Sequence, residues 1–152
     1  MNRRLVFSAL ALALGATYAV PAFSQAKPDV LVKQRQAAMV LQGKYFGPLN
    51  AMAQGKVPYD GAVVTRNAGY LDALSRMPWD GFAASTKAEK SAALPAVFTE
   101  PAKFKEAADR FQAEVTKLAT VGKSGDEASV KSQIAAVGKQ CSGCHENFRE
   151  KR

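Results

Sequence analysis

Apolar side chains recur every three or four residues in four segments of the chain, which is the spacing of an amphipathic α-helix. In the first segment, about residues 28–53, the apolar positions include Val32, Met39, Phe46 and Leu49. The stripes of the other three are Val64, Leu71 and Leu74, then Phe104, Ala108, Phe111, Val115 and Leu118, then Val130, Ile134, Val137 and Phe148. No segment alternates steadily between apolar and polar residues, so the pattern predicts an all-α protein.

Helix-starting and helix-stopping residues separate these segments. Pro28 suits the first turn of a helix, and Asp60 suits the N-cap of the second. Thr99 is a candidate N-cap for the third helix, which residues 122–125 end, and the fourth follows from Asp126. Three of the connections are short, so the helices are expected to form an antiparallel four-helix bundle.

Residues 78–95 are the least regular part of the mature chain. Pro78 stops the second helix, and Trp79 and Phe82 follow it before a stretch rich in Ala, Ser and Lys. We expect a long surface connection whose aromatic end packs onto the core.

Residues 1–24 have the order of a secretory signal peptide. Arg3 and Arg4 precede an apolar run, and small residues mark a cleavage site after Ser24, with Ala26 as the alternative. A retained membrane anchor is a second possibility, but the run is shorter than the roughly 20 residues that span a bilayer. We therefore expect a periplasmic protein that is not an integral membrane protein, with residues 25–152 forming one domain.

The chain is basic, with a formal net charge of +8, of which Arg3 and Arg4 belong to the signal peptide. The basic residues are spread over all the helical segments, and no known nucleic-acid-binding motif occurs. We therefore expect no nucleic acid partner. A basic surface can instead steer encounters with an acidic redox partner.

The only two cysteines, Cys141 and Cys144, are separated by two residues, and His145 follows directly. This Cys-x-x-Cys-His pattern is the attachment motif of c-type haem. Each thiol adds across one vinyl group to form a thioether, and residues three apart on a helix lie on one face. The imidazole of His145 can then ligate the iron, so the sequence predicts one covalently bound haem c.

Three other uses of Cys141 and Cys144 fit the sequence less well. A disulfide between residues three apart in a helix closes a strained loop and stabilises little. A thioredoxin-type pair usually opens a helix after a strand, whereas this pair lies near the end of the last predicted helix. A structural zinc site needs four ligands, and the chain offers two cysteines and one histidine.

A sixth ligand to the iron would have to come from upstream, and His145 is the only histidine. The methionines outside the signal peptide are Met39, Met52 and Met77, of which Met39 lies in mid-helix. Met39 shares its stripe with Arg35, and such a mixed face can border the propionates of a haem, with which Arg35 would pair. The alternatives are that Met39 only fills the core and that Arg35 is a solvated charge.

Several short motifs match one family of proteins. They are Lys27-Pro28-Asp29, Lys33-Gln34-Arg35-Gln36, Pro58-Tyr59-Asp60, Leu74-Ser75-Arg76-Met77-Pro78-Trp79, Phe104 and Cys141-Ser142-Gly143-Cys144-His145-Glu146-Asn147-Phe148-Arg149. On these motifs the mature chain resembles cytochrome c prime and its low-spin relatives, the class II c-type cytochromes. A haem motif at the C-terminal end sets this class apart.

The resemblance implies an antiparallel four-helix bundle that often forms a homodimer through its first two helices. The residue roles that it implies are thioether links at Cys141 and Cys144, an axial ligand at His145, propionate contacts at Arg35 and Gln36, and Arg149 beside the proximal haem face. On the distal side the family divides. Met39 would bind a six-coordinate, low-spin iron in one branch and only shield a five-coordinate, high-spin iron in the other.

Three functions follow from these alternatives. The first is one-electron transfer through the haem, with Met39 as the sixth ligand. The second is binding of nitric oxide or carbon monoxide to an open distal face, and the third is a structural bundle whose Cys-x-x-Cys-His pattern is accidental. The sequence shows no acid/base pair, nucleophile constellation or second metal site, so we do not expect an enzyme.

Overall fold

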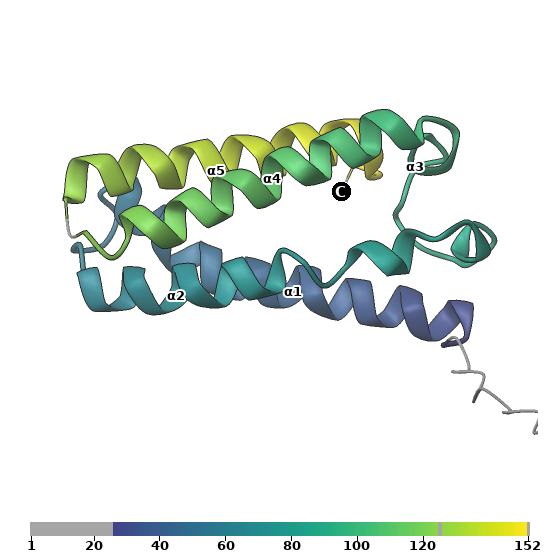
Figure 1. Cartoon of the computed structure of the whole chain (residues 1–152), viewed down its shortest axis with the longest axis horizontal. Coiled ribbons are helices and arrows are strands. Elements are labelled where there is room, and N and C mark those ends of the chain that lie inside the picture. Colours follow the sequence, from purple (N-terminus) through teal and green to yellow (C-terminus); the bar gives the residue numbers. More distant parts are fainter. Residues whose placement is uncertain (1–25, 125, 152) are drawn as a thin grey trace, which may run out of the picture.

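The computed structural model describes residues 26–124 and 126–151, and four long α-helices account for most of them (Figure 1). They are α1 (Pro28–Ala53), α2 (Gly61–Leu74), α4 (Pro101–Val121) and α5 (Glu127–Phe148). A short helix, α3 (Ala96–Thr99), precedes α4, and two 3-10 turns, η1 (Trp79–Phe82) and η2 (Ala84–Thr86), follow α2. The predicted signal peptide, residues 1–24, lies outside the described residues.

The long helices run antiparallel to their neighbours in the chain and form a closed bundle (Figure 1). Helix α1 packs against α2 and α5, and α4 packs against the same two helices on the other side. Within the described residues, backbone pairing of the β type is limited to an isolated bridge between Ala93 and Arg149. The prediction of an all-α, antiparallel four-helix bundle is therefore confirmed.

The starts of α2 and α5 are fixed by aspartate caps. The carboxylate of Asp60 accepts hydrogen bonds from the amides of Ala62 at 2.9 Å and Val63 at 3.1 Å. Asp126 does the same at the start of α5. The predicted cap at Thr99 is wrong, because Glu100 precedes α4 without a side-chain cap, and the Thr99 hydroxyl donates to the carbonyl of Pro95 inside α3.

The apolar stripes of the four long helices meet in one core. Its best-buried large members, each at most 1% exposed, are Leu49, Val64, Leu71, Val115, Leu118, Val130, Ile134 and Val137. Burial of a side chain of this size stabilises the fold by about 1.5–3 kcal/mol. The tightly packed core therefore lies toward the end of the bundle that is farther from residues 79–99.

The connection at residues 78–95 is more deeply built into the fold than the predicted surface loop. Its aromatic end packs as expected, with Trp79 against the main core and Phe82 against a second cluster around Val97 and Phe148. Gly81 and Thr86, however, are also buried. The hydroxyl of Thr86 donates to the carbonyl of Gly81 at 3.1 Å, which satisfies polar groups that composition alone places at the surface.

None of the helices in the described part of the chain is long and apolar enough to cross a membrane.

Candidate haem site

A cavity of about 700 Å³ lies between α1, α5 and the connection that follows α2. It brings together the seven side chains singled out in the sequence, which are Arg35, Gln36, Met39, Cys141, Cys144, His145 and Arg149. The first three come from α1, the cysteines and His145 from α5, and Arg149 from the residue that ends α5. Residues more than 100 positions apart in the sequence therefore form one site.

Helix α5 presents Cys141, Cys144 and His145 from its last two turns. Both cysteines are unpaired and partly buried. Burial, together with the neighbouring Cys144, raises the pKa of Cys141 to about 11. Burial also raises the pKa of Cys144, while the positive charges of Arg110 and Arg149 act in the opposite direction. Both thiols therefore stay protonated at neutral pH in this environment.

The wall between the cysteines and α1 is mainly apolar. Met39 lies on it one helical turn after Arg35. Further along the cavity the wall is formed by Phe46, Leu71 and Phe111, which belong to α1, α2 and α4. A flat, largely apolar group can be buried against this surface with little loss of polar hydration.

Arg35 is a buried cation, with 4% of its surface exposed. Its guanidinium donates hydrogen bonds to the carbonyl of Gly81 and, at 2.7 Å, to the hydroxyl of Ser91. It also lies 4.3 Å from the centre of the Phe82 ring. Burial lowers the pKa of Arg35, and no ion pair in the described part of the chain includes it.

A buried charge without a counter-ion is costly, so this arrangement suits a ligand that brings a negative group to Arg35.

Close contact between Gly81 and α1 holds the Arg35 guanidinium in place. A Cβ atom at Gly81 would lie 2.6 Å from the Cβ of Arg35 and 2.8 Å from the carbonyl oxygen of Leu31. These distances leave room only for glycine.

Gly81→Ala is expected to push the connection away from α1 and to lower the free energy of unfolding by about 1–3 kcal/mol, because the added methyl overpacks the contact. Urea denaturation of the two proteins measures the difference. Gly47→Ala is the control, because Gly47 lies in α1 with open space around its Cβ position. Equal stability of the Gly81→Ala variant and the parent would contradict the contact.

Backbone pairing with residues 92–94 holds Arg149 at the cavity. The amide of Leu94 donates to the carbonyl of Phe148 at 3.0 Å, and the amide of Glu150 donates to the carbonyl of Ala92 at 2.9 Å. The Nε atom of Arg149 is buried and has no hydrogen-bond partner among the described residues. This is a second cationic group whose hydrogen-bonding capacity is left for a ligand.

Several residues of the cavity were not predicted from the sequence. Ser91 and Gln140 are short or uncharged polar residues without a motif, and Gly81 acts only through its lack of a side chain. An aromatic chain also borders the site, with ring centroids 4.8 Å apart for Phe82 and Phe104 and 5.2 Å apart for Phe104 and Phe148. The sequence analysis placed Phe104 and Phe148 in the apolar stripes of two different helices and expected Phe82 to pack onto the core, but it did not predict that the three rings meet beside the site.

The residues present fit haem c. Two thiols on one helical face suit two vinyl groups, and the adjacent imidazole of His145 is a standard iron ligand. The apolar wall suits the macrocycle, and Arg35 and Arg149 suit its two propionate groups or another anion.

Comparisons with known proteins agree with this geometry. A family model described as Cytochrome C' matches residues 30–149. Cytochrome c' of Rubrivivax gelatinosus is 42% identical over 126 residues, which cover 82% of this chain and 98% of the relative. Its crystal structure matches with a TM-score of 0.77 at 41% identity, over 82% of this chain and 98% of that one.

A nitric oxide complex of a variant of cytochrome c prime from Alcaligenes xylosoxidans also matches, with a TM-score of 0.77 at 34% identity. The match covers 84% of this chain and 99% of that one. The family model spans nearly all of the helical bundle and includes the haem motif. The chain therefore belongs to the cytochrome c prime family, whose members carry one covalently attached c-type haem.

Proposed function

We propose that this cytochrome carries single electrons in the periplasm, through a haem bonded to Cys141 and Cys144 and ligated by His145. The observation that supports the proposal most strongly is that these residues line one cavity with Met39 and the two cations Arg35 and Arg149. The haem supplies a ferric/ferrous couple, which is a one-electron reaction.

The protein's own residues fix the geometry of the site. Cys141, Cys144 and His145 are all on α5, so one helix fixes the position of both bonds and the axial ligand. Arg35 is itself fixed by hydrogen bonds to Gly81 and Ser91 and would compensate the charge of a propionate. If the site keeps the same geometry in both oxidation states, the reorganisation energy is small, and a small reorganisation energy favours fast electron transfer.

Met39 is proposed as the sixth ligand, because among the described residues it is the one methionine that lines the cavity. Met52 is buried in the main core, and Met77 is 57% exposed at the end of α2. Ligation by Met39 would leave the iron without an open position.

Binding of nitric oxide or carbon monoxide is the second candidate function. It is supported by the apolar wall formed by Phe46, Leu71 and Phe111, because none of these side chains could compete with a small neutral gas for the iron. It is also supported by the similarity to the nitric oxide complex described above. In this case Met39 would cover the iron without binding it.

Visible spectra of the ferric and ferrous protein, before and after addition of carbon monoxide, separate the two functions. Electron transfer with Met39 ligation predicts sharp low-spin bands that the gas does not shift. Broad high-spin bands that shift with carbon monoxide would contradict that ligation and favour gas binding. A reversible potentiometric titration with a one-electron slope is expected for the carrier, and an irreversible one would contradict it.

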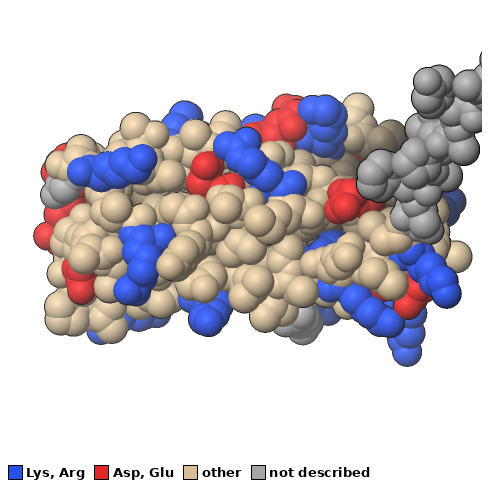
Figure 2. Space-filling view, turned by 60° about the horizontal axis from the view of Figure 1, so that its bottom comes forward, with Lys and Arg blue, Asp and Glu red and all other residues tan. Residues whose placement is uncertain are grey.

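A homodimer through α1 and α2 is also proposed. All five large apolar side chains that are exposed in the described part of the chain lie on these helices or beside them, and they are Val40, Leu41, Val57, Tyr70 and Met77. The face in Figure 2, which turns α1 and α2 forward, has uncharged surface between scattered Lys, Arg, Asp and Glu side chains. An apolar face of this kind is typical of subunit interfaces.

Tyr70→Glu is expected to convert a dimer to a monomer, because it buries a charge at such an interface. Sedimentation velocity measures the change. Ala135→Glu, on the exposed face of α5, is the control. A parent protein that sediments as a monomer at high concentration would contradict the dimer.

A further inference from the structure

Gln42 is a buried neutral amide in the wall of the haem cavity. It lies on α1 one helical turn after Met39, and 8% of its surface is exposed. Its side-chain nitrogen donates a hydrogen bond to the carbonyl of Leu74, the last residue of α2, at 2.9 Å. Only the nitrogen end of an amide can donate to a carbonyl, so this contact fixes the orientation of the side chain.

The hydrogen bond to Leu74 does not use the whole amide of Gln42. A primary amide carries two N–H donors and one carbonyl oxygen. Gln42 makes no other hydrogen bond among the described residues, so one N–H and the oxygen have no protein partner. A buried polar group without a partner is costly. The second N–H is therefore available to a ligand in the cavity.

The other neutral polar side chains of the cavity differ from this amide. The indole N–H of Trp79 already donates to the carbonyl of Ser75 at 2.7 Å. Gln36 is exposed, and Gln140 lies on α5, the helix that also carries His145. The buried amide on α1 thus combines an unused N–H with a place across the cavity from the axial histidine.

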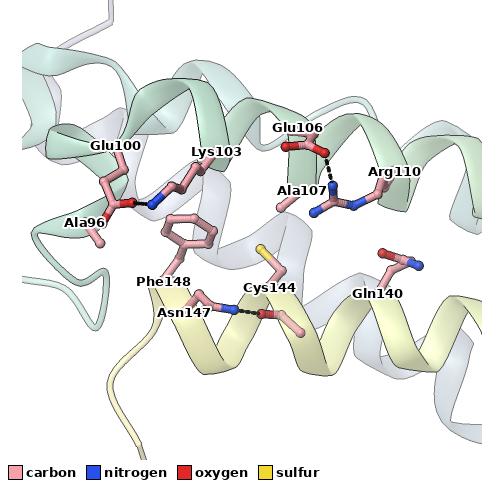
Figure 3. Close-up of a pocket in the computed structure, with 11 residues that line it drawn as sticks. Ala96, Glu100, Lys103, Glu106, Ala107, Arg110, Gln140, Cys144, Asn147 and Phe148 are labelled. Atoms are coloured by element: carbon pink, nitrogen blue, oxygen red, sulfur yellow. Dashed lines mark hydrogen bonds and ion pairs between the residues drawn. The ribbon is translucent and has the colours of Figure 1, made fainter.

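A further hollow, of about 430 Å³, lies between α4 and α5 (Figure 3). Its two acidic and two basic side chains pair with each other, Glu100 with Lys103 and Glu106 with Arg110. These charges are already compensated within the hollow, so they do not call for a ligand.

Gln42 lies near the sixth position of the iron in both proposed functions. Met39 ligates the iron in one of them and covers it in the other. Residues three apart on a helix share a face, with Cβ atoms about 5–6 Å apart, so the amide of Gln42 can reach a diatomic or triatomic ligand on the iron. The neighbouring wall at Phe46 and Leu71 is apolar, which strengthens a hydrogen bond made there.

We propose that Gln42 is the hydrogen-bond donor of the sixth position and that it favours small anions, whose outer atom is negatively charged, over carbon monoxide. A hydrogen bond to a charged acceptor is stronger than one to a weakly polar acceptor, so the same N–H discriminates between the two kinds of ligand. The proton stays on the amide, and no electron is transferred. This inference rests on the proposed haem site and applies whichever role Met39 has.

The first test measures ligand affinities in holoprotein that carries Met39→Leu, because its sixth position is open under either function. Gln42→Leu is added to this protein, since leucine has a similar volume but neither donates a hydrogen bond nor ligates iron. The affinity of the ferric protein for azide should fall about tenfold or more, as expected for the loss of a hydrogen bond to a charged group. The affinity of the ferrous protein for carbon monoxide should change much less.

Asn67→Leu in the same protein is the matched control. Asn67 is also a buried amide, 4% exposed, and it joins the same two helices by donating to the carbonyl of Tyr45 at 3.2 Å. It does not line the haem cavity. Equal azide affinities in the two variants would show that Gln42 only joins α1 to α2, and would overturn the proposal.

Gln42→Asn keeps the test decisive if Gln42→Leu does not assemble with haem. It retains the amide but withdraws the N–H by one methylene, so azide affinity should again fall. Unchanged affinity in this variant would reject Gln42 as the donor.

Infrared spectra of the ferrous carbon monoxide complexes show whether an N–H faces the ligand. A donor at the ligand oxygen lowers the C–O stretching frequency, so Gln42→Leu should raise it and Asn67→Leu should leave it unchanged. A shift to lower frequency on Gln42→Leu, or no shift, would overturn the proposal while the haem site stands. Protein that carries no haem at Cys141 and Cys144 would form neither complex, and the proposed site would then fail together with the role of Gln42.

Discussion

His145→Ala is expected to remove the axial ligand and to reduce the yield of haem-containing protein by about tenfold or more. Mutation of a residue that only hydrogen-bonds to a metal ligand already lowers metal affinity by about 10- to 100-fold, and loss of the ligand itself should cost at least as much. His145 is the only histidine of the chain, and no other imidazole can take its place. Absorbance of the Soret band per mole of purified polypeptide measures the loss.

Glu146→Ala is the matched control, because Glu146 is the next residue of α5 and is exposed. It should keep the parent's haem content and spectrum. If the His145→Ala protein keeps both as well, the axial role of His145 is wrong, and another group must hold the iron.

Met39→Leu is expected to change the spin state of the ferric iron from low to high, because leucine keeps the volume of methionine but cannot ligate. The charge-transfer band from methionine sulfur to ferric iron should disappear, and carbon monoxide should now shift the ferrous spectrum. Visible and electron paramagnetic resonance spectra record both changes.

Met52→Leu is the matched control for this substitution. Met52 is on the same helix and buried in the main core, but it does not line the haem cavity. Its replacement should leave the spectrum unchanged. If Met39→Leu leaves it unchanged too, Met39 only packs against the haem, and gas binding becomes the better account of the function.

The long helices were predictable because their signals are local. The apolar stripe and Pro28 led to a first helix over about residues 28–53, and α1 has these limits. Asp60 and Asp126 act through amides two and three residues away, so the sequence around them is sufficient to identify the caps. Thr99 failed because a local cap motif does not reveal that α3 already uses that residue.

The connection between α2 and α4 was not predictable in the same way. The burial of Gly81 depends on its approach to Arg35 and Leu31, which lie about 50 positions earlier in the chain. The contact of Ser91 with Arg35 spans a similar separation. Such long-range contacts leave no period or motif in the sequence, so this part read as an ordinary surface loop.

The residues of the site show the same difference between local and long-range signals. Cys141, Cys144 and His145 were identified from their spacing, which the chemistry of the haem demands. The cations Arg35 and Arg149 needed the family resemblance or a mixed helix face, and the structure adds that neither forms an ion pair among the described residues. The hollow between α4 and α5, which Cys144 also lines, depends on the packing of two helices and had no counterpart in the sequence.

Attachment of the haem to Cys141 and Cys144 is tested most directly by mass spectrometry of a tryptic digest. Cleavage after Lys139 and Arg149 releases residues 140–149, which contain both cysteines and His145. This peptide should absorb in the Soret region and weigh as much as its amino acids plus one haem. A colourless peptide with two free thiols or a disulfide, from protein made in a host that attaches haem c, would contradict the account.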